Sequence, residues 1–172
     1  MLCPADLRAR LCACPKDVPE FNFAGQNFYA RVIGIHDGDS LKVCFDVGGK
    51  LYKMMTRLAG IDAPEIRSKD PKEKALAVRA RDYVAAWAMP DKFKVGGEYA
   101  EKDLVNALWT DPIIVYLKCG ELDRYARLLC EMFKDNVDAH SLNSLLKQNG
   151  FADGYLGGHK ERTWDAPQLP SV

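Results

Sequence analysis

Four short segments carry side chains that could do chemistry together. They are D-G-D-S at residues 37–40, an arginine at 57, D-A-P-E at 62–65 and D-R-Y-A-R at 123–127. Carboxylates bind hard cations, and the planar guanidinium of arginine matches the geometry of a phosphate. Two acidic clusters and two arginines in this order indicate a metal-assisted cut of a phosphodiester. Each segment alone has an ordinary structural explanation, as a hairpin turn, a helix start or a surface charge, so the hypothesis depends on their combination.

Strand and turn signals place these segments at the ends of expected strands. Alternating apolar and polar residues predict strands at 28–36, 40–47 and 50–58, followed later by strands at 112–119 and 127–134. Asp37-Gly38 joins the first two strands, and we expect the glycine to supply a positive φ in a tight turn. Gly48-Gly49 joins the second strand to the third. The candidate residues therefore fall on turns and strand termini.

Two main helices are expected to pack on this sheet. The first begins at Pro71, with Asp70 as its N-cap and Glu73 in the position of a capping box. Its apolar stripe is Leu76, Ala80, Tyr83, Val84 and Trp87, and Lys72, Lys74, Arg79 and Arg81 are assigned to other faces. The second helix is expected to begin at its cap, Asp138, and to end at Gly150.

The order strand-strand-strand-helix-strand-strand-helix predicts an α+β protein that is mainly β. It fits an OB-type, five-stranded Greek-key barrel with two main helices packed on it. Residues 28–160 would form this domain, and residues 1–27 an N-terminal arm with a short helix at 5–13. Residues 90–111 look like an insertion with a helical turn or two, and residues 161–172 like a C-terminal tail.

The composition is that of one ordinary globular domain rather than a general polyanion binder. The 172 residues are 48% hydrophobic and 28% charged, and the formal net charge is zero. Residues 50–81 nevertheless carry nine Lys/Arg against four Asp/Glu, which would steer a polyanion to that stretch. We identify no secretory signal and no membrane span, and expect an intracellular protein, with an organelle or a particle left open.

Six cysteines without C-x-x-C spacing fit a reducing compartment better than a disulfide framework. Three of them lie within strand patterns, where buried thiols are common. A zinc site built from Cys3, Cys12 and Cys14 is an alternative, but no fourth ligand suggests itself.

Taken together, the four segments resemble the staphylococcal (thermonuclease-type) nuclease family over about residues 28–160. The resemblance implies a Ca²⁺ ion held by Asp39, Asp62 and the main-chain carbonyl of Ala63. Asp37 would reach the metal through water. Ala63 departs from the threonine usual in the family, but a change of side chain keeps the backbone oxygen.

The same resemblance implies that Arg57, Glu65 and Arg127 are the catalytic residues. Glu65, three residues after Asp62, would orient or deprotonate the attacking water. The two arginines would stabilise negative charge on the phosphate. Residues expected to contact the substrate are Arg124, Tyr125, Tyr155 and Lys160.

The expected function is a calcium-dependent nuclease that acts on DNA and RNA and leaves 3′-phosphate ends. One alternative is a nucleic-acid-binding module of the same fold that no longer cuts, although its carboxylates and arginines are intact. Another is a structural or accessory subunit of a large assembly, docked through the arm, the insertion and the tail. The nuclease and accessory roles are compatible.

Overall fold

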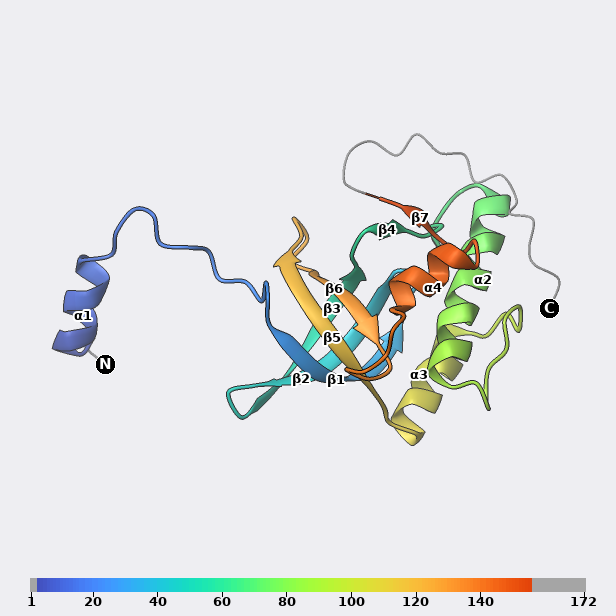
Figure 1. Ribbon diagram of the computed structural model, residues 1–172, viewed down its shortest axis with the longest axis horizontal. Coiled ribbons are helices and arrows are strands. Elements are labelled where there is room, and N and C mark those ends of the chain that lie inside the picture. The colour runs from blue at the N-terminus through green and yellow to red at the C-terminus, as the bar shows by residue number, and fades with distance from the viewer. Residues whose placement is uncertain (1–2, 156–172) are drawn as a thin grey trace.

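A computed structural model describes residues 3–155 and contains a closed five-stranded barrel (Figure 1). Its strands are β1 (Asn27–Ile35), β2 (Ser40–Val47), β3 (Lys50–Leu58), β5 (Ile113–Leu122) and β6 (Leu128–Phe133). They close in the order β1-β2-β3-β6-β5, with β3 and β6 parallel and the other pairs antiparallel. The predicted α+β, mainly β, OB-type barrel is confirmed.

The barrel interior is built from alternate residues of each strand. In β2, Leu41, Val43 and Phe45 are buried, whereas Lys42 and Asp46 are exposed, as the alternation predicts. Complete burial of each such apolar side chain stabilises the fold by about 1.5–3 kcal/mol. In β3, Thr56 and Leu58 are buried, whereas Tyr52 is 50% exposed where the strand approaches its hairpin with β2.

Helix α2 (Pro71–Ala88) begins where predicted, with the Asp70 carboxylate accepting the Lys72 N–H at 2.9 Å. Its buried face is composed mainly of small residues: Ala77, Ala80, Val84, Ala85 and Ala88. Leu76, Tyr83 and Trp87 from the predicted stripe are only partly buried. The assignment of Arg81 to an outer face is wrong: it is 9% exposed, and its Nη2 donates to the Tyr99 carbonyl where the following loop folds over the helix.

Helix α4 (Leu142–Gln148) lies beside α2 against the barrel (Figure 1). The predicted cap at Asp138 is wrong, because Ser141 is the N-cap and its Oγ accepts the Ser144 N–H at 3.2 Å. The Asp138 carboxylate instead accepts the Asp135 N–H in the preceding loop. Near these helices, β4 (Ile61–Asp62) pairs with β7 (Asp153–Gly154) in a small two-stranded sheet.

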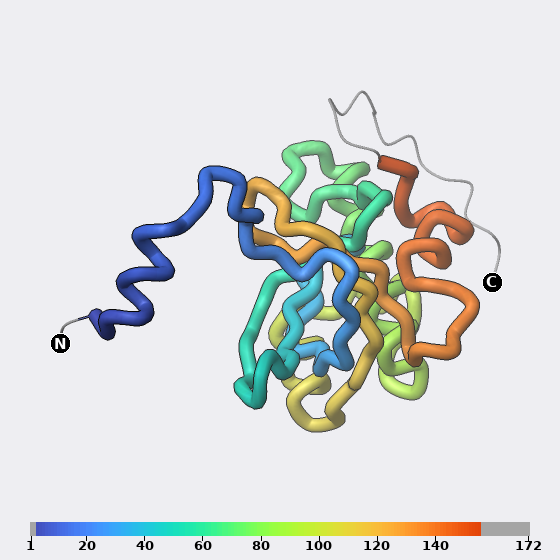
Figure 2. Tube along the Cα trace, turned by 60° about the vertical axis from the view of Figure 1, so that its left-hand side comes forward, coloured from blue at the N-terminus to red at the C-terminus, as the bar shows by residue number. Residues whose placement is uncertain are grey.

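The insertion and the arm differ in how they meet the barrel. The insertion contains α3 (Glu101–Thr110), which packs against β1 and buries Leu104 and Leu108. The arm contains α1 (Ala5–Cys12), which buries none of its residues and extends away from the barrel (Figures 1 and 2). Lys160 and residues 161–172 lie outside the described residues. Within the described part, no helix is long and apolar enough to cross a membrane.

Candidate active site

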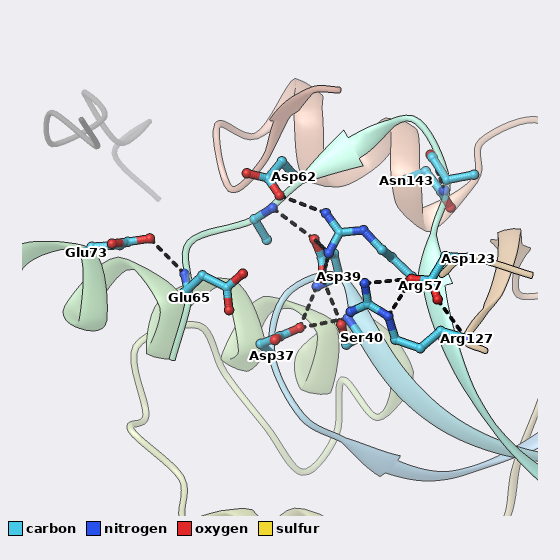
Figure 3. A network of polar contacts seen from close by, with 12 residues as sticks. Asp37, Asp39, Ser40, Arg57, Asp62, Glu65, Glu73, Asp123, Arg127 and Asn143 are labelled. Atoms are coloured by element: carbon cyan, nitrogen blue, oxygen red, sulfur yellow. Dashed lines mark hydrogen bonds and ion pairs between the residues drawn. The ribbon is translucent and has the colours of Figure 1, made fainter. Parts of the chain in front are cut away.

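The D-G-D-S segment forms a tight turn at one end of the barrel. Asp37 Oδ1 accepts the N–H groups of Asp39 at 3.1 Å and Ser40 at 2.8 Å (Figure 3). Gly38 does not have the positive φ that we expected. A Cβ atom on Gly38 would lie 2.8 Å from the Ala80 Cβ and 2.9 Å from the Ala63 Cβ. Glycine is therefore required because the turn is pressed between α2 and the D-A-P-E loop.

Asp39 is buried within this turn, and its carboxylate contacts Ser40, Ala63 and Arg57. Its Oδ1 accepts the Ser40 hydroxyl at 2.9 Å, and its Oδ2 accepts the Ala63 N–H at 3.2 Å. Its Oδ2 also lies 3.2 Å from Arg57 Nη1. Burial and the neighbouring charge of Asp37 nevertheless raise the pKa of Asp39 to about 6. An ionised Asp39 is thus costly here unless more positive charge is present.

Arg57 joins the two acidic clusters. Its Nη1 contacts Asp39, and its Nη2 lies 2.7 Å from Asp62 Oδ1 (Figure 3). All three side chains are largely buried, with Arg57 12% exposed. Burial would lower the pKa of Arg57, but Asp39 and Asp62 raise it overall. The two carboxylates, one from the turn before β2 and one from β4, therefore converge on one positively charged group.

Asp39 and Asp62 carry oxygen donors of the kind that a hard cation such as calcium takes. Calcium takes six to eight oxygen ligands, which include main-chain carbonyls and waters beside carboxylates. Asp39 and Asp62 supply two converging carboxylates, and Asp37 lies near enough to Asp39 to raise its pKa. Among residues 3–155, no three Asp, Glu, His or Cys side chains form a group that could hold a metal. A calcium ion at this position would thus depend on backbone and water oxygens for its remaining ligands.

Glu65 lies on the loop between β4 and α2, close to the acidic turn. Its N–H donates to Glu73 Oε1 at 3.1 Å, and the Ser68 hydroxyl donates to Glu73 Oε2. Glu73 therefore fixes the loop that carries Glu65, whereas the predicted capping box is not formed, since the Asp70 N–H donates to Ser68. The Glu65 side chain is exposed. Figure 3 shows it on the same side of the loop as Asp37 and Asp39.

Arg127 is held by the turn that contains it. Asp123 Oδ1 accepts the N–H groups of Tyr125 and Arg127, each at 2.9 Å. Asp123 Oδ2 accepts Arg127 Nε at 2.7 Å and lies 2.7 Å from Nη2. Burial raises the pKa of Asp123, but these hydrogen bonds lower it overall. Parallel pairing of Arg57 with Leu129 brings this turn beside β3, so all four segments meet at one end of the barrel (Figure 3).

The expected substrate-contacting residues border the same region. Tyr125 is exposed, and the guanidinium of Arg124 lies 4.8 Å from its ring centroid. The Arg57 guanidinium lies 5.8 Å from the ring of Tyr155. Lys160 is outside the described residues, so the structure places Arg124, Tyr125 and Tyr155 only.

Asn143 is a buried positioning residue that the sequence analysis missed. Its Nδ2 donates to the carbonyls of Ala59 and Cys130, at 2.9 and 3.1 Å. Its Oδ1 accepts the Met132 N–H at 3.1 Å. It thereby ties α4 and β6 to the backbone that leads into β4 and Asp62. The only signal in the sequence is a lone amide on the apolar face of α4.

A scan against protein-family models finds no match for this chain, and a search of curated proteins finds no match either.

Proposed function

We propose that this protein is a calcium-dependent nuclease, similar to staphylococcal nuclease, that hydrolyses phosphodiester bonds in DNA and RNA. The observation that supports it best is the convergence of Asp39 and Asp62 on Arg57 at one end of the barrel. Glu65 and Arg127 lie at the same end and come from different segments (Figure 3). Buried carboxylates beside arginines are expensive to assemble, so their grouping is typical of a functional site.

In this proposal, Asp39, Asp62 and the main-chain carbonyl of Ala63 would hold calcium, with Asp37 acting through water. When bound, calcium would supply positive charge that stabilises the negative charge developing on the phosphate. The raised pKa of Asp39 fits such a role, because added positive charge would favour its ionised form.

The chain's own residues would bind the phosphate and move a proton. Arg57 and Arg127 would donate N–H groups to the phosphate oxygens. Their guanidinium groups, which in this structure contact Asp39, Asp62 and Asp123, would then be shared between these carboxylates and the phosphate. Glu65, which is exposed, would accept a proton from water as the water oxygen bonds to phosphorus. The bond between phosphorus and the 5′-oxygen breaks, and that oxygen takes a proton from solvent, which leaves a 3′-phosphate and a 5′-hydroxyl.

The proposal is tested by cleavage of labelled single- and double-stranded DNA and RNA, in calcium and in EGTA. We expect cutting only in calcium, with Glu65→Gln slower by about 10²–10³, the usual cost of losing one group from a preorganised site. Glu131→Gln, on the exposed face of β6, is the matched control and should cut like the parent. A Glu65→Gln protein that cuts as fast as the parent would show that the assigned mechanism is wrong.

An accessory role in an assembly is a second candidate, and the arm favours it. Leu11, Val18 and Phe21 are exposed apolar residues on a segment that extends away from the barrel (Figure 2). Helix α1 on the same arm buries none of its residues, so this surface is available to contact another protein. Removing residues 1–22 should abolish any assembly detected by size measurement and leave calcium-dependent cutting intact. A protein that is monomeric with and without the arm would argue against this role.

A further inference from the structure

A pocket of about 410 Å³ lies outside the candidate active site. Its floor is the outer face of β1, β2 and β3, and its wall is α3, which belongs to the insertion. The volume is within the range of pockets that bind small ligands. The pocket therefore exists because the insertion covers part of the barrel.

Positively charged side chains dominate its polar lining. Lys42 and Lys53 project from the outer faces of β2 and β3, and neither forms an ion pair with a described residue. The acidic residue in the lining is Glu101, whose Oε1 lies 3.8 Å from His36 Nδ1. Two lysines without acidic partners in a concave site favour an anionic ligand.

Trp109 supplies a rigid aromatic surface beside these lysines. It is 51% exposed, and the Arg31 guanidinium lies 4.6 Å from its ring centroid. Arg31 Nη2 also donates to the carbonyls of Leu108 and Trp109, at 3.1 and 3.2 Å. Lys53 Nζ lies 5.8 Å from the same ring. An exposed ring held in place next to cations is the arrangement on which bases of single-stranded nucleic acids stack.

The pocket and the candidate active site both take residues from β3. Lys53, Met55 and Arg57 alternate on one face of the strand, and two of them line the pocket while the third contacts Asp39 and Asp62. Four residues of strand span about 13 Å at about 3.3 Å per residue. His36, which lines the pocket, follows β1 and directly precedes the D-G-D-S turn. A chain bound at Arg57 therefore needs only a short extension to reach Trp109.

We propose that this pocket binds a nucleotide of a single-stranded DNA or RNA chain whose neighbouring phosphodiester lies at the candidate active site. Lys42 and Lys53 contact phosphate, and Trp109 stacks on the base. The choice of ligand rests on the proposed nuclease function, because it assumes that the nearby site takes a polynucleotide. An acidic peptide would satisfy the lysines but would leave the aromatic surface without a role.

The test measures, by fluorescence anisotropy, how tightly the full chain binds a labelled single-stranded oligonucleotide of about ten nucleotides in EGTA. Trp109→Ala should weaken binding about tenfold. Lys53→Ala should weaken it and make the dependence of log affinity on log salt shallower by about 0.7. Lys134→Ala is the matched control, because Lys134 Nζ lies 5.5 Å from the Trp87 ring on another part of the molecule. It should bind like the parent.

Cleavage of a dinucleotide in calcium separates this pocket from the active site. A dinucleotide fills the active site alone, so Trp109→Ala should cut it at the parental rate while losing affinity for the longer chain. If Trp109→Ala unfolds, as judged by circular dichroism, Trp109→Phe and Lys42→Ala replace it, with binding retained in the first and weakened in the second.

Failure of the pocket and failure of the proposed function give different results. A Trp109→Ala protein that cuts in calcium and binds the oligonucleotide like the parent would overturn the pocket alone. Trp109-dependent oligonucleotide binding by a chain that cuts neither DNA nor RNA would support the pocket and overturn the nuclease. Binding of polyglutamate that depends on Lys42 and Lys53, with no binding of the oligonucleotide, would overturn the nucleotide assignment in favour of an acidic peptide.

Discussion

Arg57 and Arg127 bring the same chemical group to the same end of the barrel, yet their surroundings differ. Arg57 is 12% exposed and contacts carboxylates from two other segments, Asp39 and Asp62. Arg127 is 26% exposed and contacts Asp123, four residues earlier in its own turn. Arg57 therefore balances buried charge that belongs to the fold, whereas Arg127 is held locally. The comparison separates an arginine needed for both stability and the proposed catalysis from one needed for catalysis alone.

Arg57→Ala should have the largest effect. It leaves Asp39 and Asp62 buried without their shared cation, which typically destabilises a protein by about 3–5 kcal/mol. Under the proposed function it also slows cleavage by about 10²–10³. Chemical denaturation in EGTA and cleavage in calcium measure the two effects separately. A variant as stable as the parent would show that Arg57 does not balance the buried carboxylates.

Arg127→Ala should slow cleavage about as much as Arg57→Ala, by about 10²–10³, but change stability by less than about 1 kcal/mol. The ion pair that it removes is partly exposed and lies within one turn. Denaturation and cleavage of this variant, run beside Arg57→Ala, test the comparison directly. Equal losses of stability in the two variants would remove the distinction between the arginines.

Asp39→Asn should abolish calcium-dependent cutting but stabilise the protein in EGTA. The pKa of Asp39 is raised from 3.8 to about 6 in the folded chain, so its ionisation favours unfolding. Protonated Asp39 stabilises the fold fully below about pH 4, and this stabilisation is lost as the pH rises through about 6. The free energy of unfolding of the variant should therefore rise relative to that of the parent over that interval, by roughly 2–3 kcal/mol at neutral pH. Parallel denaturation curves at pH 4 and pH 7 measure this gain, and an equal difference at both values would contradict it.

Asp123→Ala should have a smaller effect, about tenfold on the rate of cleavage, because Arg127 remains but loses the carboxylate that orients it. Arg124→Ala is the control within the same turn. Its guanidinium lies over the exposed Tyr125 ring, so its loss should weaken substrate binding only a few-fold. Values of kcat and KM for both variants distinguish the two defects, because poor orientation of Arg127 lowers kcat, whereas weaker substrate binding raises KM.

The parts of the fold that depend on local sequence could be predicted closely. Strands β2 and β3 have the predicted bounds, because alternation and the Gly48-Gly49 turn are contained in adjacent residues. The predicted start of α4 was wrong because Asp138 and Ser141 are both good cap residues. In the folded loop the Asp138 carboxylate accepts the Asp135 N–H, and Ser141 caps the helix. The role of Gly38 was wrong because the close approach of Ala63 and Ala80 arises only from tertiary packing.

For the candidate site, residue types could be predicted but their partners could not. The motifs indicated which carboxylates and arginines to consider. They did not indicate that Arg57 contacts both acidic clusters, since this depends on how β3 meets β2 and β4. Asn143 was missed for the same reason, because its three hydrogen bonds go to residues distant in the sequence. The calcium and nuclease assignments remain predictions for the cleavage assay.

The parallel pairing of β3 with β6 also has a consequence for how the protein is made. Thr56 and Arg57 meet Leu128 and Leu129 only after β4, α2, α3 and β5 have been synthesised. Closing so long a loop is slow compared with forming the early hairpins. A nascent chain therefore carries the acidic turns without Arg127 beside them until β6 has been synthesised and has paired with β3. Under the proposed function, fragments that end before β6 should not cut nucleic acid, and the ribosome and its messenger RNA would be exposed to an assembled site only after β6 has been synthesised.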